Sequence, residues 1–446
     1  MSGQFIRVIR RKEILALAFG AMIGWSWVAL TGTWIATAGS VGAMLAFAVG
    51  GVAVILVGLT YAELASAMPK AGGEHVYSQR ALGNTASFIC TWAILLGYVS
   101  VVAFEAVALP TVADYLLPGF SRGYLWTVAG WDVQFTWVLL GVVAAIVMTA
   151  INILGIRTAA RLQLLATVLV AGVGLLLIAG SAVSGDAQNM QPLFVSGAKG
   201  FLGVLVMVPF MFVGFDVIPQ SAEEVDVPFR DIGKLLMLSI GLALAWYLVI
   251  IFSVSMGLPD AARRASELAT ADASAMALGG VWAGKLLVLA GIGGILTSWN
   301  AFLIGGSRAI YALARAGQLP ASLGTLHPRF NTPYKAVLLI GGLSVLAPLF
   351  GRPALVWLVD AGGLGIVIAY ALVAWSFLVL RVREPEMPRP YSVKNWRLIG
   401  GAALVLSVAI AILYLPGSPA ALVWPYEWLI VLGWVVLGAL LLRRAR

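Results

Sequence analysis

The chain has 446 residues, of which 61% are hydrophobic and only 11% are charged, and its mean hydropathy is +0.99. Such a composition excludes a water-soluble domain and predicts an all-α polytopic membrane protein. A single cysteine and two histidines exclude an internal disulfide framework and argue against a protein-built metal or haem site, so we expect no cofactor.

Apolar windows of about 20 residues, each long enough to cross a bilayer, recur along the whole chain. They predict twelve membrane-spanning helices within a single transporter domain over residues 1–446. We place these helices at residues 14–38, 42–67, 84–117, 134–154, 161–183, 199–222, 233–258, 281–314, 335–350, 354–380, 398–416 and 426–442. The polar stretch 72–81 predicts an interfacial helix on the cytoplasmic side, and the stretch 259–280 predicts one amphipathic external helix.

The 28 lysine and arginine residues determine the orientation. Most of them fall on one side of the membrane if the N-terminus is inside. We therefore expect a multi-pass protein of the cell inner membrane with both termini cytoplasmic. The net charge of +9 follows from this asymmetry and requires no nucleic-acid partner. The expected partners are the lipid bilayer and a small-molecule substrate, with the chain acting as a monomer or homodimer.

Two of the predicted helices contain residues that an ordinary membrane helix avoids. Residues 14–27 bring two glycines, a serine and two tryptophans to mid-depth, and residues 208–220 combine two prolines with Gly214 and Asp216. Irregular backbone survives at membrane depth only where protein surrounds it or where it lines a cavity. Interrupted segments at matching positions of two halves are typical of the binding site of a secondary transporter.

The interrupted helices open two sets of five helices with similar lengths. Because five is an odd number, two copies of such a unit must insert with opposite topology. The sequence therefore predicts an inverted repeat, with residues 14–183 as the first copy and 199–380 as the second. The two additional helices in residues 398–442 fall outside it. Such a repeat places the substrate near the bilayer midplane, between the two breaks.

Four motifs carry a family resemblance. They are residues 61–77 (YAELASAMPKAGGEHVY), 214–224 (GFDVIPQSAEE), 307–320 (SRAIYALARAGQLP) and 380–385 (LRVREP). Together and in this order they resemble the amino acid–polyamine–organocation permeases. The resemblance implies the LeuT-type fold, a five-plus-five inverted repeat with helices 1 and 6 broken. It also implies alternating-access transport of small amines or amino acids.

One departure from the family pattern concerns the substrate. Amino-acid carriers of this family usually have a break of small residues in helix 1, whose free N–H groups hold the substrate carboxylate. The matching stretch here is Gly24-Trp25-Ser26, which is similar to that of the ethanolamine permeases, as is Glu105 five residues before a proline. A local resemblance to cationic amino-acid transporters is also present. The departure implies an ethanolamine-like amine. The alternative is an amino acid:cation symporter or an amino-acid exchanger that recognises the carboxylate at the same break.

The candidate substrate-binding residues come from the two breaks and from helices 3 and 8. They are Ile23, Gly24, Trp25, Ser26, Glu105, Phe212, Phe215, Asp216 and Phe302. A carboxylate at mid-membrane costs about 2.5–3.5 kcal/mol on the insertion scale, so Glu105 is interpreted as a counter-ion for a substrate ammonium or as a proton carrier. The alternative is a structural acid. Asp216 either contacts the ligand or caps the break. Trp25 either offers a cation–π face or packs in the core.

The coupling ion is predicted to be Na⁺ or H⁺. Thr297 and Ser298 are adjacent hydroxyls in helix 8, and in sodium-coupled relatives such a pair ligates Na⁺. The remaining ligands would then be backbone carbonyls near Gly20 and Ile23. The alternative is hydrogen bonding of both hydroxyls to their own helix. The lysine that some proton-coupled relatives place in helix 5 is absent from this chain. With no nucleophile–base pair or metal cluster in view, we do not expect an enzyme.

Overall fold

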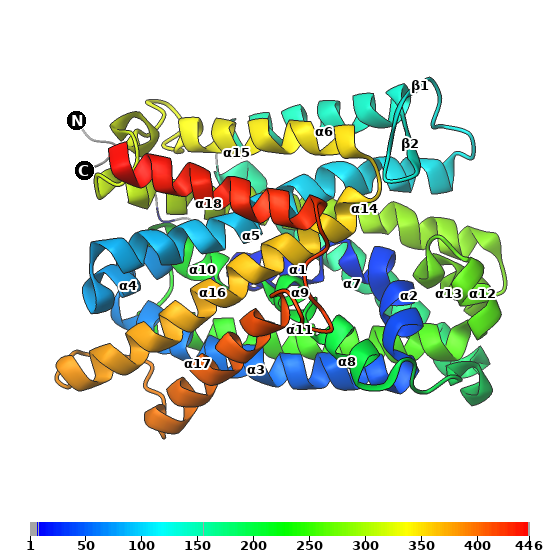
Figure 1. Ribbon diagram of the computed structural model, residues 1–446, viewed down its shortest axis with the longest axis horizontal. Helices are drawn as coiled ribbons and strands as arrows, with labels where there is room; N and C mark the ends of the chain where they lie inside the picture. Colours follow the sequence, from blue (N-terminus) through cyan, green and yellow to red (C-terminus); the bar gives the residue numbers. More distant parts are fainter. Residues whose placement is uncertain (1–6, 8, 155, 445–446) are drawn as a thin grey trace.

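The computed structural model describes residues 7, 9–154 and 156–444, and helices account for nearly all of the regular structure. Most of these helices lie side by side along the long axis (Figure 1). The helices of the twelve predicted segments are α1 (Arg11–Ile23), α2 (Ser26–Ala38), α3 (Ser40–Ala67), α5 (Asn84–Leu116), α6 (Phe135–Leu154), α7 (Ile156–Ser184), α8 (Gly197–Leu205), α9 (Val208–Phe212), α10 (Val217–Gln220), α11 (Phe229–Gly257), α14 (Val281–Arg315), α15 (Tyr334–Leu346), α16 (Ala354–Arg383), α17 (Trp396–Leu413) and α18 (Tyr426–Arg444).

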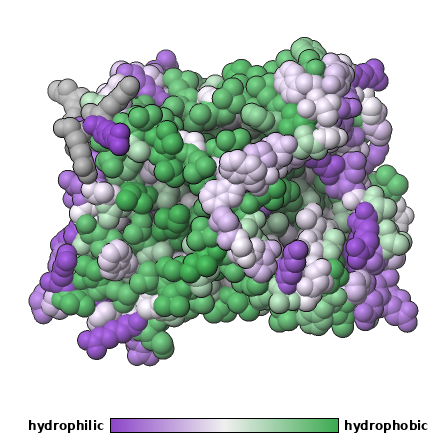
Figure 2. All heavy atoms as spheres, viewed as in Figure 1, coloured by the Kyte–Doolittle hydropathy of each residue, from purple (hydrophilic) through white to green (hydrophobic). Residues whose placement is uncertain are grey.

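The predicted membrane-spanning segments are confirmed as helical in the described part of the chain. Eleven of them are long and apolar enough to cross a membrane. The twelfth, Tyr334–Phe350, is shorter, because α15 ends at Leu346 and a 3₁₀ turn containing Pro348 completes it. Figure 2 shows apolar side chains over the middle of the molecule and hydrophilic ones gathered at its two ends, as expected for a protein that spans a bilayer.

The two ends of the molecule carry different elements (Figure 1). The chain termini and the short helix α4 (Glu74–Leu82) lie at one end, which we call the termini end. A hairpin of β1 (Tyr124–Val128) and β2 (Trp131–Gln134) lies at the other end with the short helices α12 (Asp260–Ala265) and α13 (Ala269–Ala277). We call this the hairpin end.

The connecting segments differ in detail from the predictions. The expected interfacial helix starts at Glu74, because Gly72 and Gly73 adopt positive φ angles of 101° and 36° that a right-handed helix does not allow. The expected single external helix is two helices, α12 and α13, separated by extended backbone at Ser266. The hairpin was not predicted. Its two-residue turn places Ala129 and Gly130 at positive φ, the geometry that closes tight hairpins.

The helices differ in how far they are enclosed by protein. In the most apolar window of α5 and of α14, 83% of residues are buried, against 17% in Tyr426–Arg443. Helices α5 and α14 therefore form the centre of the molecule, while α18 lies at its periphery with apolar side chains exposed. Helix α14 contacts both α1 and α10, and Tyr98 of α5 donates to Asp216 at the second interrupted segment.

Candidate functional site

The first break separates α1 from α2 at Gly24 and Trp25. Gly24 has a φ of +27°, so the helix cannot continue through it. On α14, the glycine at 294 faces the Gly24 carbonyl, and the glycine at 291 faces the Trp25 ring. A side chain at either glycine would overlap these groups. The missing side chains on α14 are therefore what allows the broken backbone to pack closely against it.

The second break lies directly against the first. Helix α9 ends at Phe212 and α10 begins at Val217. Between them, Gly214 adopts a φ of +135° and packs against Ala21 and Met22 of α1. The predicted interruptions of helices 1 and 6 are thus confirmed, and the tertiary structure brings them together.

Both carboxyl oxygens of Asp216 accept hydrogen bonds from other groups of the protein. Its Oδ1 accepts a hydrogen bond from the Gly214 N–H at 2.7 Å, and its Oδ2 accepts one from the Tyr98 hydroxyl at 2.8 Å. The side chain is fully buried. This arrangement matches the alternative in which Asp216 caps the break and holds its irregular backbone in place.

Tyr247 joins the two broken helices and was missed by the sequence reasoning. From α11, its hydroxyl donates to the Met22 carbonyl at 2.6 Å and lies 3.2 Å from the Met211 carbonyl. The Ser26 hydroxyl lies 3.0 Å from the Tyr247 hydroxyl oxygen. The only signal in the sequence is a hydroxyl in the middle of an apolar helix, which does not reveal its partners.

Glu105 lies beside the first break with one oxygen unused. Its Oε1 accepts a hydrogen bond from the Ser298 hydroxyl of α14, whereas its Oε2 has no hydrogen-bond partner among the described residues. The side chain is 2% exposed, and none of the ion pairs formed by the described residues includes it. A side chain added at Gly24 would come within 3.5 Å of Oε1. The geometry therefore provides a buried carboxyl that can accept a hydrogen bond from a cation or hold a proton.

The aromatic residues expected at the site belong to buried ring clusters around the breaks. Phe212 contacts Tyr247 at a centroid distance of 5.5 Å, and Phe302 contacts Tyr98 at 5.4 Å. Phe215 contacts Tyr61 and Tyr370 at 5.3 and 5.6 Å. The Trp25 ring packs against α14.

The structure separates the two adjacent hydroxyls of α14. Thr297 donates toward the Gly20 carbonyl of α1 at 2.9 Å, whereas Ser298 bonds Glu105. Both hydroxyls also lie within hydrogen-bond distance of the Gly294 carbonyl in their own helix, at 2.8 and 3.0 Å. Thr297 and Gly20 are therefore brought together as the sodium hypothesis requires, while Ser298 turns to a carboxylate. The coupling ion stays a prediction.

Polar side chains of α7, which the sequence reasoning did not single out, also reach the first broken helix. Gln163 and Thr167 each donate to the Ala16 carbonyl, at 3.2 and 3.3 Å. Asn300 of α14 donates to the Gln163 side-chain oxygen at 3.0 Å. Neutral amides and hydroxyls thus tie α1 to both α7 and α14.

Buried ion pairs close the termini end beneath the second break. Arg308 of α14 and Glu224, which follows α10, are 2.8 Å apart and only 2–3% exposed. Glu63 of α3 pairs with Arg381 and Arg389 at 2.5 and 3.0 Å. Each pair joins segments that are far apart in the sequence, so together they fasten the helices at this end.

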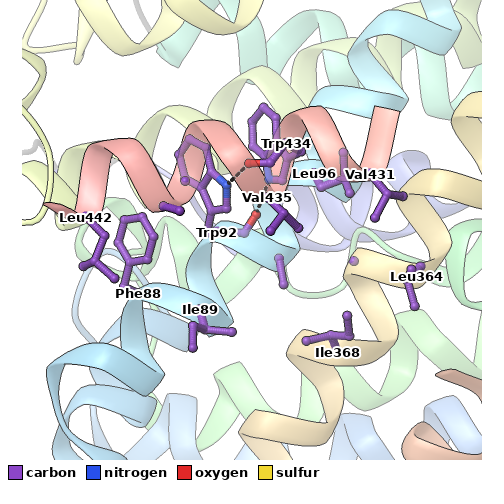
Figure 3. A pocket seen from close by; sticks show the side chains of 14 residues that line it. Phe88, Ile89, Trp92, Leu96, Leu364, Ile368, Val431, Trp434, Val435 and Leu442 are labelled. Atoms are coloured by element: carbon purple, nitrogen blue, oxygen red, sulfur yellow. Dashed lines mark hydrogen bonds between the residues drawn. The ribbon is translucent and has the colours of Figure 1, made fainter. Parts of the chain in front are cut away.

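A separate apolar cavity of about 260 Å³ lies between α5, α16 and α18 (Figure 3). Trp92 and Trp434 line it as a stacked pair with ring centroids 4.4 Å apart, and each indole N–H donates to the other residue's backbone carbonyl, at 2.8 and 2.7 Å. The lining residues are all apolar or glycine. The lining contains no charged side chain that could pair with an ammonium or a carboxylate, so this cavity is not the candidate substrate site.

The candidate site is closed to solvent in this structure. Its residues are all buried: Ile23, Gly24, Trp25, Ser26, Glu105, Phe212, Phe215, Asp216 and Phe302. Access therefore requires a rearrangement of the helices around the breaks. Among the described residues, no group of three or more His, Cys, Asp or Glu side chains could hold a metal ion.

Known proteins with similar sequences indicate the family of this chain. The branched-chain amino acid permease BcaP of Bacillus subtilis is 29% identical over 399 residues, covering 88% of this chain and 85% of the relative. A methylthioribose transporter of Bacillus subtilis is 24% identical, covering 98% of this chain and 93% of the relative. The aspartate-proton symporter of the same organism is 25% identical, covering 92% of this chain and 79% of the relative.

The names of these relatives are those of permeases and transporters rather than enzymes. The family model described as "Amino acid permease" matches residues 10–439, almost the whole chain. This match confirms the superfamily resemblance expected from the four motifs. The chain belongs to the amino acid permease family.

Proposed function

We propose that this permease carries a small molecule with a primary ammonium group across the cell inner membrane by alternating access. The observation that carries the proposal is the Oε2 of Glu105, which is buried beside the Gly24 break and has no hydrogen-bond partner in the described part of the chain. A buried carboxylate without a counter-ion is costly, and a bound ammonium would offset that cost. In this proposal Ser298 orients the carboxyl group through its other oxygen.

Two substrate classes share that ammonium and differ in a carboxylate. An amino acid is supported by the start of α2 at Ser26, because the first N–H groups of a helix lack intrahelical acceptors and attract an anion. The branched-chain amino acid permease among the relatives also supports it. An ethanolamine-like amine is supported by Trp25, whose bulk replaces a small residue at this break. A methylthioribose transporter among the relatives illustrates that membership of the family does not determine the substrate.

The orientation follows from the basic residues. The arginines near the ends of the chain and in the connections at the termini end support a cytoplasmic location for that end. The substrate would then enter from the hairpin end and leave toward α4. We further propose that residues 14–183 and 199–380 act as inverted repeats, and that tilting of the broken helices opens the site to each side in turn.

The test is uptake of labelled ethanolamine and labelled leucine into proteoliposomes, with unlabelled alanine, leucine, lysine, glutamine and putrescine as competitors. Competition by amino acids alone would support carboxylate recognition at Ser26. Competition by amines alone would support the ethanolamine-like class. If neither label enters and no competitor protects the protein against thermal unfolding, the ammonium proposal is wrong.

A further inference from the structure

A second buried acid lies at the termini end, outside the site described above. Glu74 is the first residue of α4, and its side chain is fully buried. Its Oε2 accepts a hydrogen bond from the Gln220 side chain of α10, while its Oε1 has no partner among the described residues. The Gly72 N–H also donates to the Gln220 carbonyl at 3.2 Å. Glu74 therefore lies in the contact between α4 and the inner half of the second broken helix.

No cation from the described part of the chain balances this carboxyl group. None of the ion pairs formed by the described residues includes Glu74. The ionisable groups that act on it or feel its charge are all acidic, and they come from every side: Tyr61 of α3, Tyr77 of α4 itself, Cys90 and Tyr98 of α5, Asp216 at the second break, and Tyr370 of α16. On α14, Arg308 is bonded to Glu224. A dry carboxylate in such surroundings is strongly disfavoured.

The neighbouring histidine does not supply the missing charge. The Nδ1 of His75 shares a hydrogen bond of 2.7 Å with the Ser87 hydroxyl, and burial lowers the pKa of His75 to about 4. It is therefore neutral at physiological pH. Burial also raises the pKa of Glu74 well above its ordinary value, and the nearby Asp216 raises it further.

We propose that Glu74 binds the proton that couples transport to a proton gradient. This inference rests on the proposed function, because it assigns the coupling ion of the same transport cycle. Glu74 holds its proton on the carboxyl group while α4 and α10 are in contact. When α10 moves away and water enters from the cytoplasm, the O–H bond breaks and the proton passes to water.

The carboxylate left behind must be reprotonated from the substrate side to complete a coupled cycle. Asp216, at the second break, is the acid on that side whose charge acts on Glu74, and Tyr61, Tyr98 and Tyr370 each lie within electrostatic range of both acids. Tyr98 is bonded directly to Asp216. The protonation states of the closed and open arrangements determine how pH shifts the balance between them. The closed arrangement binds one proton more than the open one, so acid favours closure and alkali favours opening toward the cytoplasm.

The experiment compares two modes of transport in proteoliposomes. One is accumulation of a labelled substrate driven by an acid exterior, and the other is substrate counterflow at equal pH. The variant is Glu74→Gln, which keeps the shape of the side chain and cannot release a proton. The matched control is Glu386→Gln, at an exposed acid in the connection after α16. We expect Glu74→Gln to lose at least tenfold of the gradient-driven accumulation while counterflow persists, and Glu386→Gln to keep both.

Several outcomes would overturn the inference. Gradient-driven accumulation that survives in Glu74→Gln is one. Wild-type counterflow without any effect of the pH gradient is another, and it leaves the proposed function intact. If Glu74→Gln does not fold, a pH-sensitive dye inside wild-type liposomes still tests the inference, because substrate entry that leaves the interior pH unchanged would overturn it. Absence of both counterflow and uptake in the wild type would instead refute the proposed function.

Discussion

The Tyr247 hydroxyl donates a hydrogen bond of 2.6 Å to the Met22 carbonyl, one of the backbone groups freed by the break in the first helix. The same hydroxyl lies 3.2 Å from the Met211 carbonyl in the second broken helix. One side chain of α11 therefore links both irregular segments. A buried carbonyl without a partner is costly at membrane depth, so this link stabilises the broken geometry.

Replacement of Tyr247 by phenylalanine removes that link and keeps the ring packing. We expect Tyr247→Phe to lower stability by about 0.6–1.7 kcal/mol, from the average to the maximum measured for hydrogen bonds between membrane helices. Uptake should fall at the same time, because the broken helices lose a common anchor. The measurement is thermal unfolding in detergent together with initial uptake rates. Tyr124→Phe, at an exposed tyrosine of the hairpin, is the control. Equal behaviour of the two variants would contradict the bridging role.

Glu105→Gln tests the ammonium site. The amide keeps the size of the side chain and removes the negative charge that would balance an ammonium. We expect initial uptake to fall at least tenfold, which corresponds to about 1.4 kcal/mol. Glu267→Gln is the matched control, because that side chain is 73% exposed at the hairpin end. Uptake rates are the measurement. Unchanged uptake in Glu105→Gln would show that the carboxyl group plays a structural part only.

Gly294→Ala tests the close approach of the first break to α14. A methyl group at this position overlaps the Gly24 carbonyl. Forcing it in should cost about 1–3 kcal/mol and displace the break, so both stability and uptake should fall. At Gly241 in α11, an added methyl group would meet no atom within 4 Å. Gly241→Ala should therefore be neutral or stabilising by up to about 1 kcal/mol. Thermal unfolding of the two variants side by side checks the prediction, which fails if they behave alike.

The Arg308–Glu224 pair tests how the termini end is fastened. Removal of one partner leaves a charge buried without compensation, so Arg308→Met and Glu224→Met should each lose about 3–5 kcal/mol. The double variant should lose clearly less than the sum, because no uncompensated charge remains. A double-mutant cycle in denaturant measures this coupling. Additive losses would show that the two side chains act independently.

The features that could be predicted from the sequence are those determined by residues close together in the chain. Local composition was sufficient for the helices, because a run of apolar residues must satisfy its own backbone in lipid. It was also sufficient for the interruptions at Gly24 and Gly214, since glycine permits the required backbone angles. The hairpin at Ala129 and Gly130 was missed, although its two-residue turn between strand-forming residues is a readable local signal.

Partners across the molecule could not be predicted. The structure shows that the two carboxyl oxygens of Asp216 accept hydrogen bonds from Gly214 and Tyr98, partners that no local pattern indicates. It also shows that the adjacent hydroxyls of Thr297 and Ser298 reach different helices. Side-chain contacts between helices depend on rotation and packing, which no local pattern of residues determines.

The sequence by itself therefore determined the class of protein, the membrane-spanning helices, the positions of the two breaks and the family motifs. These features depend on hydropathy, glycine geometry and short motifs, all of which act locally along the chain. The tertiary structure alone decided which side chains meet at the breaks. It brought Tyr247 to two broken helices, left one oxygen of Glu105 without a partner among the residues described, and buried Glu74 against Gln220. The physical reason is that in a dry interior each polar group must find its partner in space, whatever their separation in the sequence.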